Sequence, residues 1–165
     1  FLLVPSYSKY EELNSWVNIS KVNRISLITA CSETFVQKNT NMSLNENLDQ
    51  IDKILNSPSD KKFRIYISTC FGCPFEGTIN ESHFKNIELI FNRFCHHEKT
   101  EEIVISDTIG TYDMDQLHHY IKNFNSSNKF LILYVLFFCN IWKTFHFEYP
   151  SGISVSSIQF EFTKL

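Results

Sequence analysis

Glycine and proline are scarce in this chain of 165 residues, with four of each, and its 15 lysines and arginines are scattered. The formal net charge is −3, so neither a nucleic-acid groove nor an anionic membrane surface is expected as the main partner. A hydrophobic fraction of 43%, which includes 16 phenylalanines, is enough to build a core. Wholesale disorder and a fibrous repeat are therefore excluded, and the length suits about one domain.

No apolar run reaches the length of a membrane span. The longest extends over 13 residues, from Phe130 to Trp142, and Asn140 interrupts it, whereas a spanning helix needs about 20 residues. We expect a buried strand or a core helix there and no membrane partner. The sequence shows no signal peptide, and its five cysteines follow no secreted disulfide pattern, so a reduced cytosolic or organelle-matrix setting is favoured.

Three short runs rich in β-branched residues predict buried parallel strands at Arg24–Ala30, Phe63–Thr69 and Glu102–Ser106. A weaker candidate, Phe1–Val4, ends before Pro5. The first residues of the three strong candidates lie 39 positions apart in each case. This regular spacing favours a parallel α/β fold, either an open sheet or a barrel. Because a (β/α)₈ barrel needs about 250 residues, this chain would form about half of one.

Polar side chains that can cap a helix precede the apolar residues at helical spacing between these strands. The predicted helix starts are Ser8 with Glu11, Ser43 with Glu46, Asn80 or Ser82, and Asp113 with Gln116.

Small, polar and turn-forming residues follow the carboxyl ends of the three strong strands. These segments are residues 30–33, 68–77 and 106–110. Function in parallel α/β folds is located at this edge of the sheet. We therefore predict that the three segments form a substrate-facing rim.

Three motifs occupy this predicted rim, and a fourth lies on the strand before Thr69. They are Ser32-Glu33 with Lys38, Asn39 and Asn41, then Gly72-Cys73-Pro74-Phe75-Glu76-Gly77, then Asp107-Thr108-Ile109-Gly110, and Arg64-x-Tyr66. In order and approximate spacing they resemble 3-hydroxy-3-methylglutaryl-CoA (HMG-CoA) lyase over roughly residues 1 to 125. The resemblance implies an α/β fold that is a partial (β/α)₈ TIM barrel, covering about strands three to six.

What the resemblance implies about chemistry is carbon–carbon cleavage of HMG-CoA to acetyl-CoA and acetoacetate, a step of ketogenesis and leucine catabolism. The partner is then an acyl-CoA, and a divalent cation, Mg²⁺ or Mn²⁺, holds and polarises the substrate oxygens. An arginine on strand one stabilises the departing enolate. The compartment would be the mitochondrial matrix or the cytoplasm, and a dimer like the family's requires a complete barrel.

The resemblance also assigns roles to individual residues. Asp107 and Tyr66 would support catalysis, Asp107 by orienting the metal-site residues and Tyr66 by facing the acyl group. Ser32, Glu33 and Cys73 would bind substrate. Each also has a structural interpretation, because Asp107 can order a loop, Tyr66 can fill the barrel, and Ser32 or Glu33 can cap the chain that follows.

The last part of the chain departs from the family. Strand seven should carry His-x-His as metal ligands, and the nearest match places His146 six residues before Gly152, with Glu148 at the second position. A carboxylate is an acceptable ligand for Mg²⁺ or Mn²⁺. The interval from Asp107 to His146 is longer than the family's. We therefore divide the chain into a partial lyase domain, 1–128, and a divergent segment, 129–165, which is either the strand-seven region or non-native sequence.

Several groups of the family's active site would fall outside this chain. The strand-one Arg-Asp pair would precede Phe1, and the catalytic-cysteine loop would follow Leu165. Removing such groups usually lowers the rate by orders of magnitude, and a half-barrel exposes unpaired strand edges. The polypeptide alone is therefore predicted to be inactive and poorly soluble.

Two other functions stay open. One is a related Claisen-type synthase that condenses acetyl-CoA with a 2-oxo acid, because such enzymes share the motif at 107–110; the motif at 72–77 counts against it. The other is a non-catalytic remnant that binds a partner.

Two cysteine and histidine patterns have simpler interpretations than metal binding. Cys70-x-x-Cys73 alone is a weak signal for a redox pair or half of a zinc site, and a structural role is favoured. The adjacent histidines at 96–97 and 118–119 are not expected to chelate, because neighbouring residues on a helix point about 100° apart.

Overall fold

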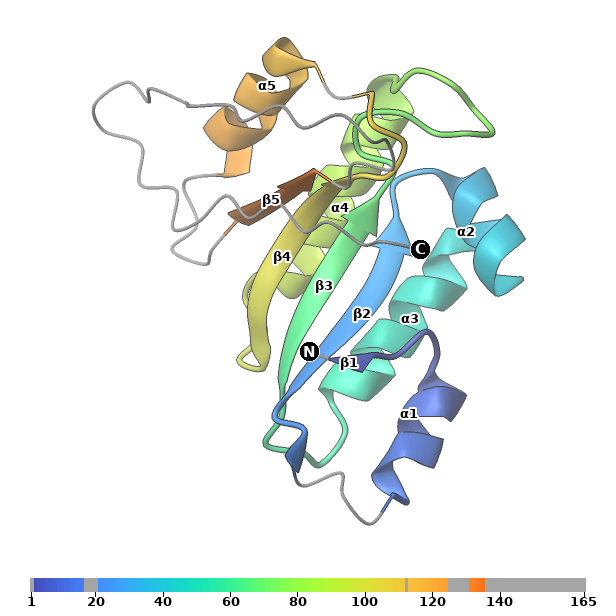
Figure 1. The fold of residues 1–165 in the computed structure, drawn as a ribbon, viewed down its shortest axis with the longest axis vertical. Coiled ribbons are helices and arrows are strands. Elements are labelled where there is room, and N and C mark those ends of the chain that lie inside the picture. Colours follow the sequence, from blue (N-terminus) through green and yellow to red (C-terminus); the bar gives the residue numbers. More distant parts are fainter. Residues whose placement is uncertain (1, 17–20, 112, 125–130, 136–165) are drawn as a thin grey trace.

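The computed structural model describes residues 2–16, 21–111, 113–124 and 131–135 (Figure 1). The candidate metal ligands His146 and Glu148 lie outside these residues, as does most of the segment 129–165. The described part is an α/β structure in which strands alternate with helices along the chain.

A single parallel sheet of five strands organises the described chain, with the spatial order β1-β2-β3-β4-β5. Its strands are β1 (Leu2–Leu3), β2 (Arg24–Ala30), β3 (Lys62–Ser68), β4 (Thr100–Asp107) and β5 (Leu131–Val135). The three strong strand predictions are confirmed to within two residues at each end, and the weak one is shortened to β1. Sequential parallel strands joined by helices are the repeating unit of a (β/α)₈ barrel.

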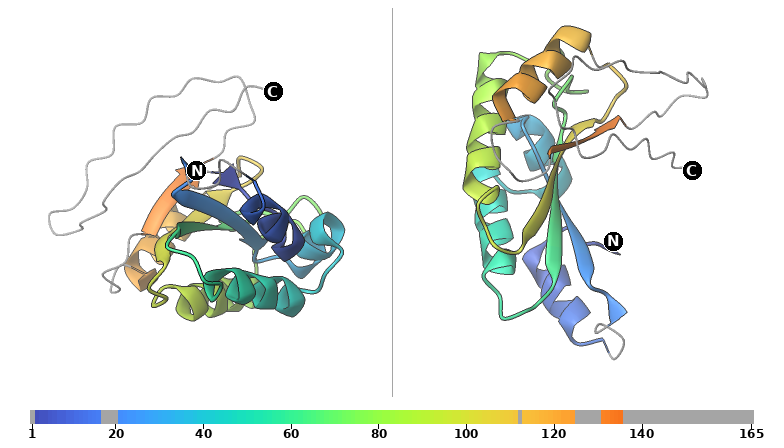
Figure 2. Two further views of the ribbon diagram at one scale, coloured as in Figure 1. Left: turned by 90° about the horizontal axis from the view of Figure 1, so that it is seen from below. Right: turned by 90° about the vertical axis from the view of Figure 1, so that its left-hand side faces the viewer.

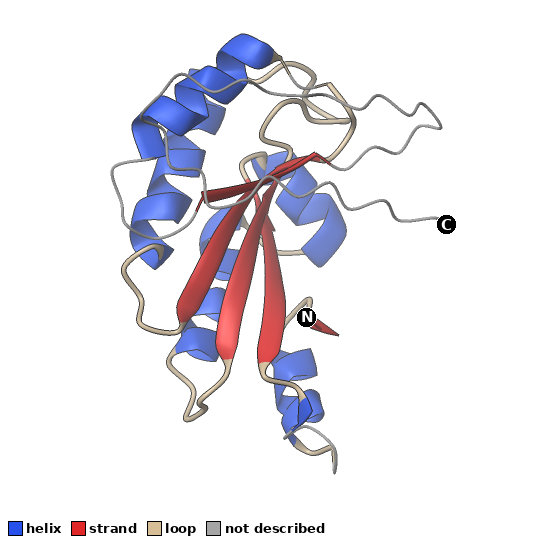
Figure 3. Ribbon diagram, turned by 60° about the vertical axis from the view of Figure 1, so that its left-hand side comes forward, coloured by secondary structure: helices blue, strands red, loops and turns tan. Residues whose placement is uncertain are grey.

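Helices connect the strands and cover one face of the sheet. They are α1 (Tyr7–Asn14), α2 (Glu33–Thr40), α3 (Leu44–Leu55), α4 (Glu81–Phe94) and α5 (Met114–Phe124). Figures 2 and 3 show α3 and α4 running along the same side of β2–β4. The capping box of Ser43 with Glu46 is confirmed, and Asn80, rather than Ser82, caps α4.

Two local predictions about helices need correction. The first helix is capped by Ser6, not by Ser8, because Ser6 has an extended conformation and its hydroxyl accepts a hydrogen bond from the Lys9 amide. Helix α2 was not predicted as a helix. Its eight residues lie between the strand that ends at Ala30 and the predicted helix start at Ser43, where the sequence predicted only motif residues of the rim.

Alternate residues of β2, β3 and β4 face different surroundings. One set, on the helix-covered face, belongs to the main hydrophobic core: Ile25, Leu27, Phe63, Ile65, Ile67, Ile103 and Ile105. The other set places Ser26, Arg64 and Glu102 in one row and Ile28, Tyr66 and Val104 in the next. In a closed barrel the second face would line the interior.

Candidate functional site at the carboxyl end of the sheet

Three connections meet where β2, β3 and β4 end. The Cys31 amide donates to the Ser68 carbonyl at 3.1 Å, and the Cys70 amide donates to the Ser106 carbonyl at 3.2 Å. These bonds continue the parallel ladder into the loops, so each loop starts in register with its neighbour. The structure thus brings together the three segments in which the sequence predicted a rim.

Thr69 links all three connections and has an unusual backbone conformation. Its φ of +62° lies in the left-handed region, which costs a β-branched residue about 1–3 kcal/mol. Surrounding hydrogen bonds stabilise it: the Thr69 amide donates to Thr108 Oγ1 at 2.8 Å, and Thr69 Oγ1 accepts from the Ser32 amide at 3.4 Å. Backbone strain maintained in this way is frequent at functional sites.

Gly72 allows the second and third connections to pack closely. A Cβ at this position would lie 2.4 Å from Thr111 Oγ1 and 3.2 Å from Ile109 Cδ1. Five residues on, Gly77 has a φ of +78°, and its amide and carbonyl each pair with Cys73 at 2.8 Å. The two glycines of this motif therefore have different roles: Gly72 permits a close approach, and Gly77 closes a tight turn.

Ser32 and Cys73, both predicted to bind substrate, contact each other. Ser32 is buried and caps α2, its hydroxyl accepting a hydrogen bond from the Phe35 amide at 3.0 Å. The buried Cys73 thiol donates to the same hydroxyl at 3.1 Å. Glu33 is instead exposed in the first turn of α2, where a negative charge is favoured. The local structural interpretation of Ser32 as a cap is confirmed.

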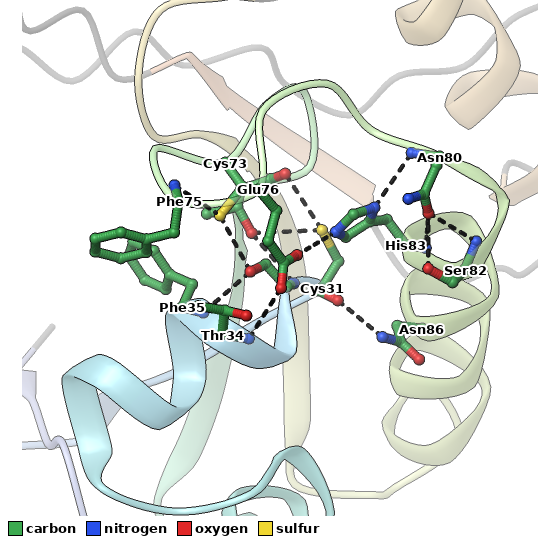
Figure 4. A network of polar contacts seen from close by, with 12 residues as sticks. Cys31, Thr34, Phe35, Cys73, Phe75, Glu76, Asn80, Ser82, His83 and Asn86 are labelled. Carbon is green, nitrogen blue, oxygen red and sulfur yellow. Dashed lines mark hydrogen bonds and ion pairs between the residues drawn. The ribbon is translucent and has the colours of Figure 1, made fainter.

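Glu76 belongs to the motif at 72–77, but the sequence did not predict a separate role for it. One carboxylate oxygen accepts from the Thr34 amide at 3.2 Å, and the other lies 2.5 Å from His83 Nε2 (Figure 4). Partial burial raises the pKa of Glu76, but hydrogen bonds from Thr34, His83 and Ser32 outweigh it and lower the pKa to about 2. Glu76 thus joins its loop to the first turns of two helices.

The partner of Glu76 is oriented by a second hydrogen bond. The Asn80 amide donates to His83 Nδ1 at 3.2 Å, so the proton of the neutral ring lies on Nε2, facing the Glu76 carboxylate. The signal for this arrangement was present in the sequence as Asn80-x-x-His83, which has the spacing of a capping box. Histidine replaces the usual Glu or Gln at the third helical position, which hid the pattern.

Asp107 is fully buried at the end of β4. Its Oδ1 accepts hydrogen bonds from the amides of Gly110 at 2.9 Å and Thr111 at 3.1 Å. The carboxylate therefore orders the turn after β4, as the structural interpretation predicts. This ordered turn places Thr108 and Thr111 against the loop that follows β3.

Tyr66 lies apart from this network, in the middle of β3 and on the face opposite the main core. Its hydroxyl accepts from Arg64 Nη1 at 3.1 Å, and its ring packs against Val104. Arg64 also forms an ion pair with Glu102 on β4. Of the predicted site residues, the structure thus links Ser32, Cys73 and Asp107 through neighbouring loops and places Tyr66 on a separate surface.

An aromatic and cationic surface borders the same edge. The rings of Phe35 and Phe75 lie 6.0 Å apart, and Lys38 Nζ is 4.6 Å above the Phe75 ring. Phe75 is 49% exposed, which is high for a large apolar side chain. Such a combination can stack a planar group and attract a phosphate.

One histidine of each adjacent pair has a structural partner within the described chain. His97 follows the end of α4, and its Nδ1 accepts from the Lys99 amide at 3.2 Å. On α5, His119 packs its ring 5.0 Å from that of Phe84. Among the described residues no group of three or more His, Cys, Asp or Glu side chains is arranged to hold a metal ion.

Comparison with known proteins supports the resemblance over part of the chain. No family model matches the sequence. The mitochondrial HMG-CoA lyase of Bos taurus is 33% identical over 89 residues, or 52% of this chain and 26% of the bovine protein. The cytoplasmic HMG-CoA lyase of Danio rerio is 29% identical over 91 residues, or 53% and 26%. The chain thus matches about a quarter of the length of these curated relatives.

Solved structures extend the likeness to the fold. The HMG-CoA lyase of Bacillus subtilis superposes with a TM-score of 0.63 at 27% identity, over 79% of this chain and 43% of that protein. An HMG-CoA lyase of Acinetobacter baumannii, solved with coenzyme A and 3-methylmalate, gives 0.60 at 20% identity, over 79% and 41%. The chain is therefore similar to part of an HMG-CoA lyase barrel, as its motifs predict. Within the described residues, no helix is both long and apolar enough to cross a membrane.

Proposed function

We propose that this chain is part of a carbon–carbon lyase that cleaves HMG-CoA to acetyl-CoA and acetoacetate. The observation that carries the proposal is the meeting of three lyase-like motifs at one edge of the sheet, linked through Thr69 to Ser32 and Thr108. In barrel enzymes this edge is where substrate binds. The division into a lyase-like part, 1–128, and a divergent segment, 129–165, belongs to the same proposal.

The proposed roles follow the positions of the side chains. Asp107 maintains the turn after β4 and so positions the groups around it. Ser32 and Cys73, paired at 3.1 Å, form the wall between the first two connections, with Glu33 at its exposed end. Tyr66 would face the acyl group from the sheet surface that lines the interior of a closed barrel.

The substrate of this proposed enzyme is an acyl-CoA, and the surface beside the rim suits its polar end. Phe75 offers an exposed ring on which an adenine can stack, and Lys38 offers a cation for a phosphate. Phe75 and Lys38 would contact the coenzyme A part of the substrate and not the carbons that react. Binding of coenzyme A and cleavage of HMG-CoA can therefore be tested separately.

A divalent cation, Mg²⁺ or Mn²⁺, is part of the proposal as a Lewis acid for the substrate oxygens. The described residues offer no complete ligand set, and the candidates His146 and Glu148 lie beyond them.

Cleavage must remove the hydroxyl proton, break the carbon–carbon bond and stabilise the acetyl-CoA enolate. Asp107 and Tyr66 would support these steps without carrying them out, so we propose that the 165-residue chain has no activity alone and that its compartment, mitochondrial or cytoplasmic, follows that of a complete enzyme. A dimer like the family's would likewise need the whole barrel.

A chimaera tests the proposal directly. Residues 24–124 replace the matching part of the Bacillus subtilis lyase barrel, and acetoacetate release from HMG-CoA is followed with Mg²⁺ or Mn²⁺ present. We expect measurable cleavage, lost when Asp107→Ala is added and kept with Glu88→Gln, an exposed position on α4.

The outcomes separate the candidate functions. A folded chimaera that binds coenzyme A without cleaving HMG-CoA contradicts the lyase proposal. Condensation of acetyl-CoA with a 2-oxo acid would favour the Claisen-type synthase, which shares the motif at 107–110. The same assay on the 165-residue chain alone should show no turnover above background.

A further inference from the structure

Two buried thiols, Cys31 and Cys70, enter the same hydrophobic core from the ends of neighbouring strands. Both are 0% exposed, and both belong to the main core cluster. Cys31 directly follows β2 and continues the helix-covered face. On an undisturbed strand, Cys70 would point to the opposite face from Ile67, because side chains alternate. The left-handed φ of Thr69 interrupts the alternation and explains why Cys70 shares the core with Cys31.

Strand register places the two cysteines at adjoining positions just past the ends of neighbouring strands. Ala30 pairs with Ser68, and the Cys31 amide continues the ladder to the Ser68 carbonyl. Neighbouring parallel strands are about 4.8 Å apart, so the two loops that contain Cys31 and Cys70 start side by side, and a disulfide needs Cα atoms about 4.4–6.8 Å apart. Cys31 Sγ is 3.2 Å from the Thr69 carbonyl oxygen, on the peptide that leads into Cys70.

The thiols also influence each other's ionisation. Interaction with the Cys70 thiol is the largest influence on Cys31 and lowers its pKa, followed by burial, which opposes the shift, and a hydrogen bond from Thr69, which adds to it. Burial and then the proximity of Cys31 raise the pKa of Cys70. Cys31 is therefore the thiol that ionises first, and the thiolate is the form that reacts with oxidants.

We propose that Cys31 and Cys70 are a reversible oxidation site that forms a disulfide when the protein meets a peroxide. The Cys31 thiolate attacks one peroxide oxygen, the O–O bond breaks, and a sulfenic acid and hydroxide result; the hydroxide takes up the proton that Cys31 released and becomes water. The Cys70 thiol then attacks Cys31 Sγ, and its proton leaves with the displaced hydroxide as a second water. In sum, two thiols are oxidised to one disulfide while one peroxide is reduced to two waters, and a thiol reductant reverses the change.

The more obvious pair, Cys70 with Cys73, is disfavoured by geometry. Cys73 lies outside the core cluster and directs its sulfur to Ser32 Oγ at 3.1 Å. Cys70 instead directs its thiol to the Ile67 carbonyl at 3.0 Å. The CxxC spacing therefore does not predict the oxidised pair, and the strand register does.

The disulfide would alter the edge described above. Its formation removes the hydrogen bond from Cys31 to the Thr69 carbonyl, one of the contacts around the strained residue. The neighbouring Cys70 carbonyl accepts a hydrogen bond from Tyr120 on α5. Oxidation would therefore remove a contact of Thr69, the residue that joins the three connections. This effect does not depend on the chain's enzymatic role.

The test uses the full 165-residue chain and hydrogen peroxide. Three variants keep one pair of cysteines each, and all carry Cys95→Ser and Cys139→Ser. Adding Cys73→Ser retains the pair 31 and 70, adding Cys70→Ser retains 31 and 73, and adding Cys31→Ser retains 70 and 73. Intramolecular disulfide is measured by mass spectrometry before and after reduction, in buffer and in urea.

In buffer we expect the first variant to lose two hydrogen atoms under peroxide and regain them with a thiol reductant, and the other two to form no intramolecular bond. In urea the preference should disappear, since it depends on the folded register. The unsubstituted chain gives the same answer by fragment mapping if a variant fails to fold. A Cys70–Cys73 bond in the folded chain, or stable thiols at 31 and 70, would overturn the proposal.

Discussion

The helix-covered face of the sheet and the loops at its carboxyl end are held together in different ways. On the face, residues such as Ile65 and Leu48 are fully buried and belong to the main hydrophobic core. In the loops, Thr69, Ser32 and Glu76 are linked by hydrogen bonds between segments that are about 40 residues apart in sequence. The face tolerates exchange of one apolar side chain for another of similar volume, whereas the loops depend on particular atoms at particular distances.

This difference explains why the two regions respond to different changes. A core weakens when volume is removed, since the cavity is only partly refilled. A network of close loops weakens when volume is added or when one donor or acceptor is lost. Three substitutions sharpen the contrast.

The largest effect is expected for Ile65→Ala on the helix-covered face. Ile65 is 0% exposed, and truncation of such a residue costs about 2–5 kcal/mol of unfolding free energy. The matched control is Ile28→Ala, on the opposite face and only half-buried, which should cost less. Urea denaturation measures both. Equal losses at the two positions would show that the two faces do not differ in packing.

A smaller loss, about 1–3 kcal/mol, is expected for Gly72→Ala in the loops, because the new methyl group overlaps Thr111 Oγ1. Adding Thr111→Ala removes that oxygen and should restore most of the stability, as measured by a double-mutant cycle.

Gly77→Ala provides the control for this cycle. It should cost about 1–2 kcal/mol through its positive φ, and Thr111→Ala should leave that cost unchanged, since no atom of the described residues lies within 4 Å of the added methyl. If Thr111→Ala restores the stability of both glycine variants or of neither, the close approach to Thr111 does not explain the destabilisation caused by Gly72→Ala.

The smallest effect is confined to acid and concerns Glu76. Its pKa in the folded protein is about 2, below the ordinary 4.5, so ionised Glu76 stabilises the fold fully above pH 4.5. That contribution is lost as the pH falls from about 4.5 to about 2. Glu76→Gln should lower the midpoint of thermal unfolding at pH 7 and flatten its dependence on pH in this window.

The neighbouring carboxylate serves as the control for the acid effect. Glu33→Gln changes an exposed residue in the first turn of α2 and should leave the pH dependence nearly as it is. If Glu76→Gln keeps the full slope between pH 4.5 and 2, the contacts of Glu76 with Thr34 and His83 do not stabilise the fold.

The fold was largely predictable because its strands and long helices repeat local patterns. The runs at Arg24–Ala30 and Leu44–Leu55 have the apolar spacing of a buried strand and an amphipathic helix, and both form as predicted. The start of α1 was misplaced because Ser6 and Ser8 both precede helix-forming residues, and only the structure shows that the Ser6 hydroxyl accepts from the Lys9 amide. Helix α2 was missed because only Val36 of its eight residues is buried, so its apolar spacing is weak.

The site was predictable in its location but not in its contacts. Motif order placed Ser32, Cys73 and Asp107 at one edge of the sheet. That Cys73 faces Ser32 while Cys70 enters the core with Cys31 depends on the left-handed turn at Thr69. Nothing in the order of residues identifies a threonine as the position with positive φ, since threonine rarely adopts it. The role of Glu76 was hidden for a similar reason, because its partners come from two separate helices.

The sequence by itself determined the parallel α/β class, the helix-covered core and the edge at which the lyase-like motifs gather. Each of these follows from local periodicity and from the direction of parallel strands. The tertiary structure alone decided the burial of Cys31 and Cys70 in one core, the close approach at Gly72 and the bridge from Glu76 to His83. These depend on distances between segments distant in sequence, and such distances are set only when the hydrophobic face packs and brings the strand ends into register.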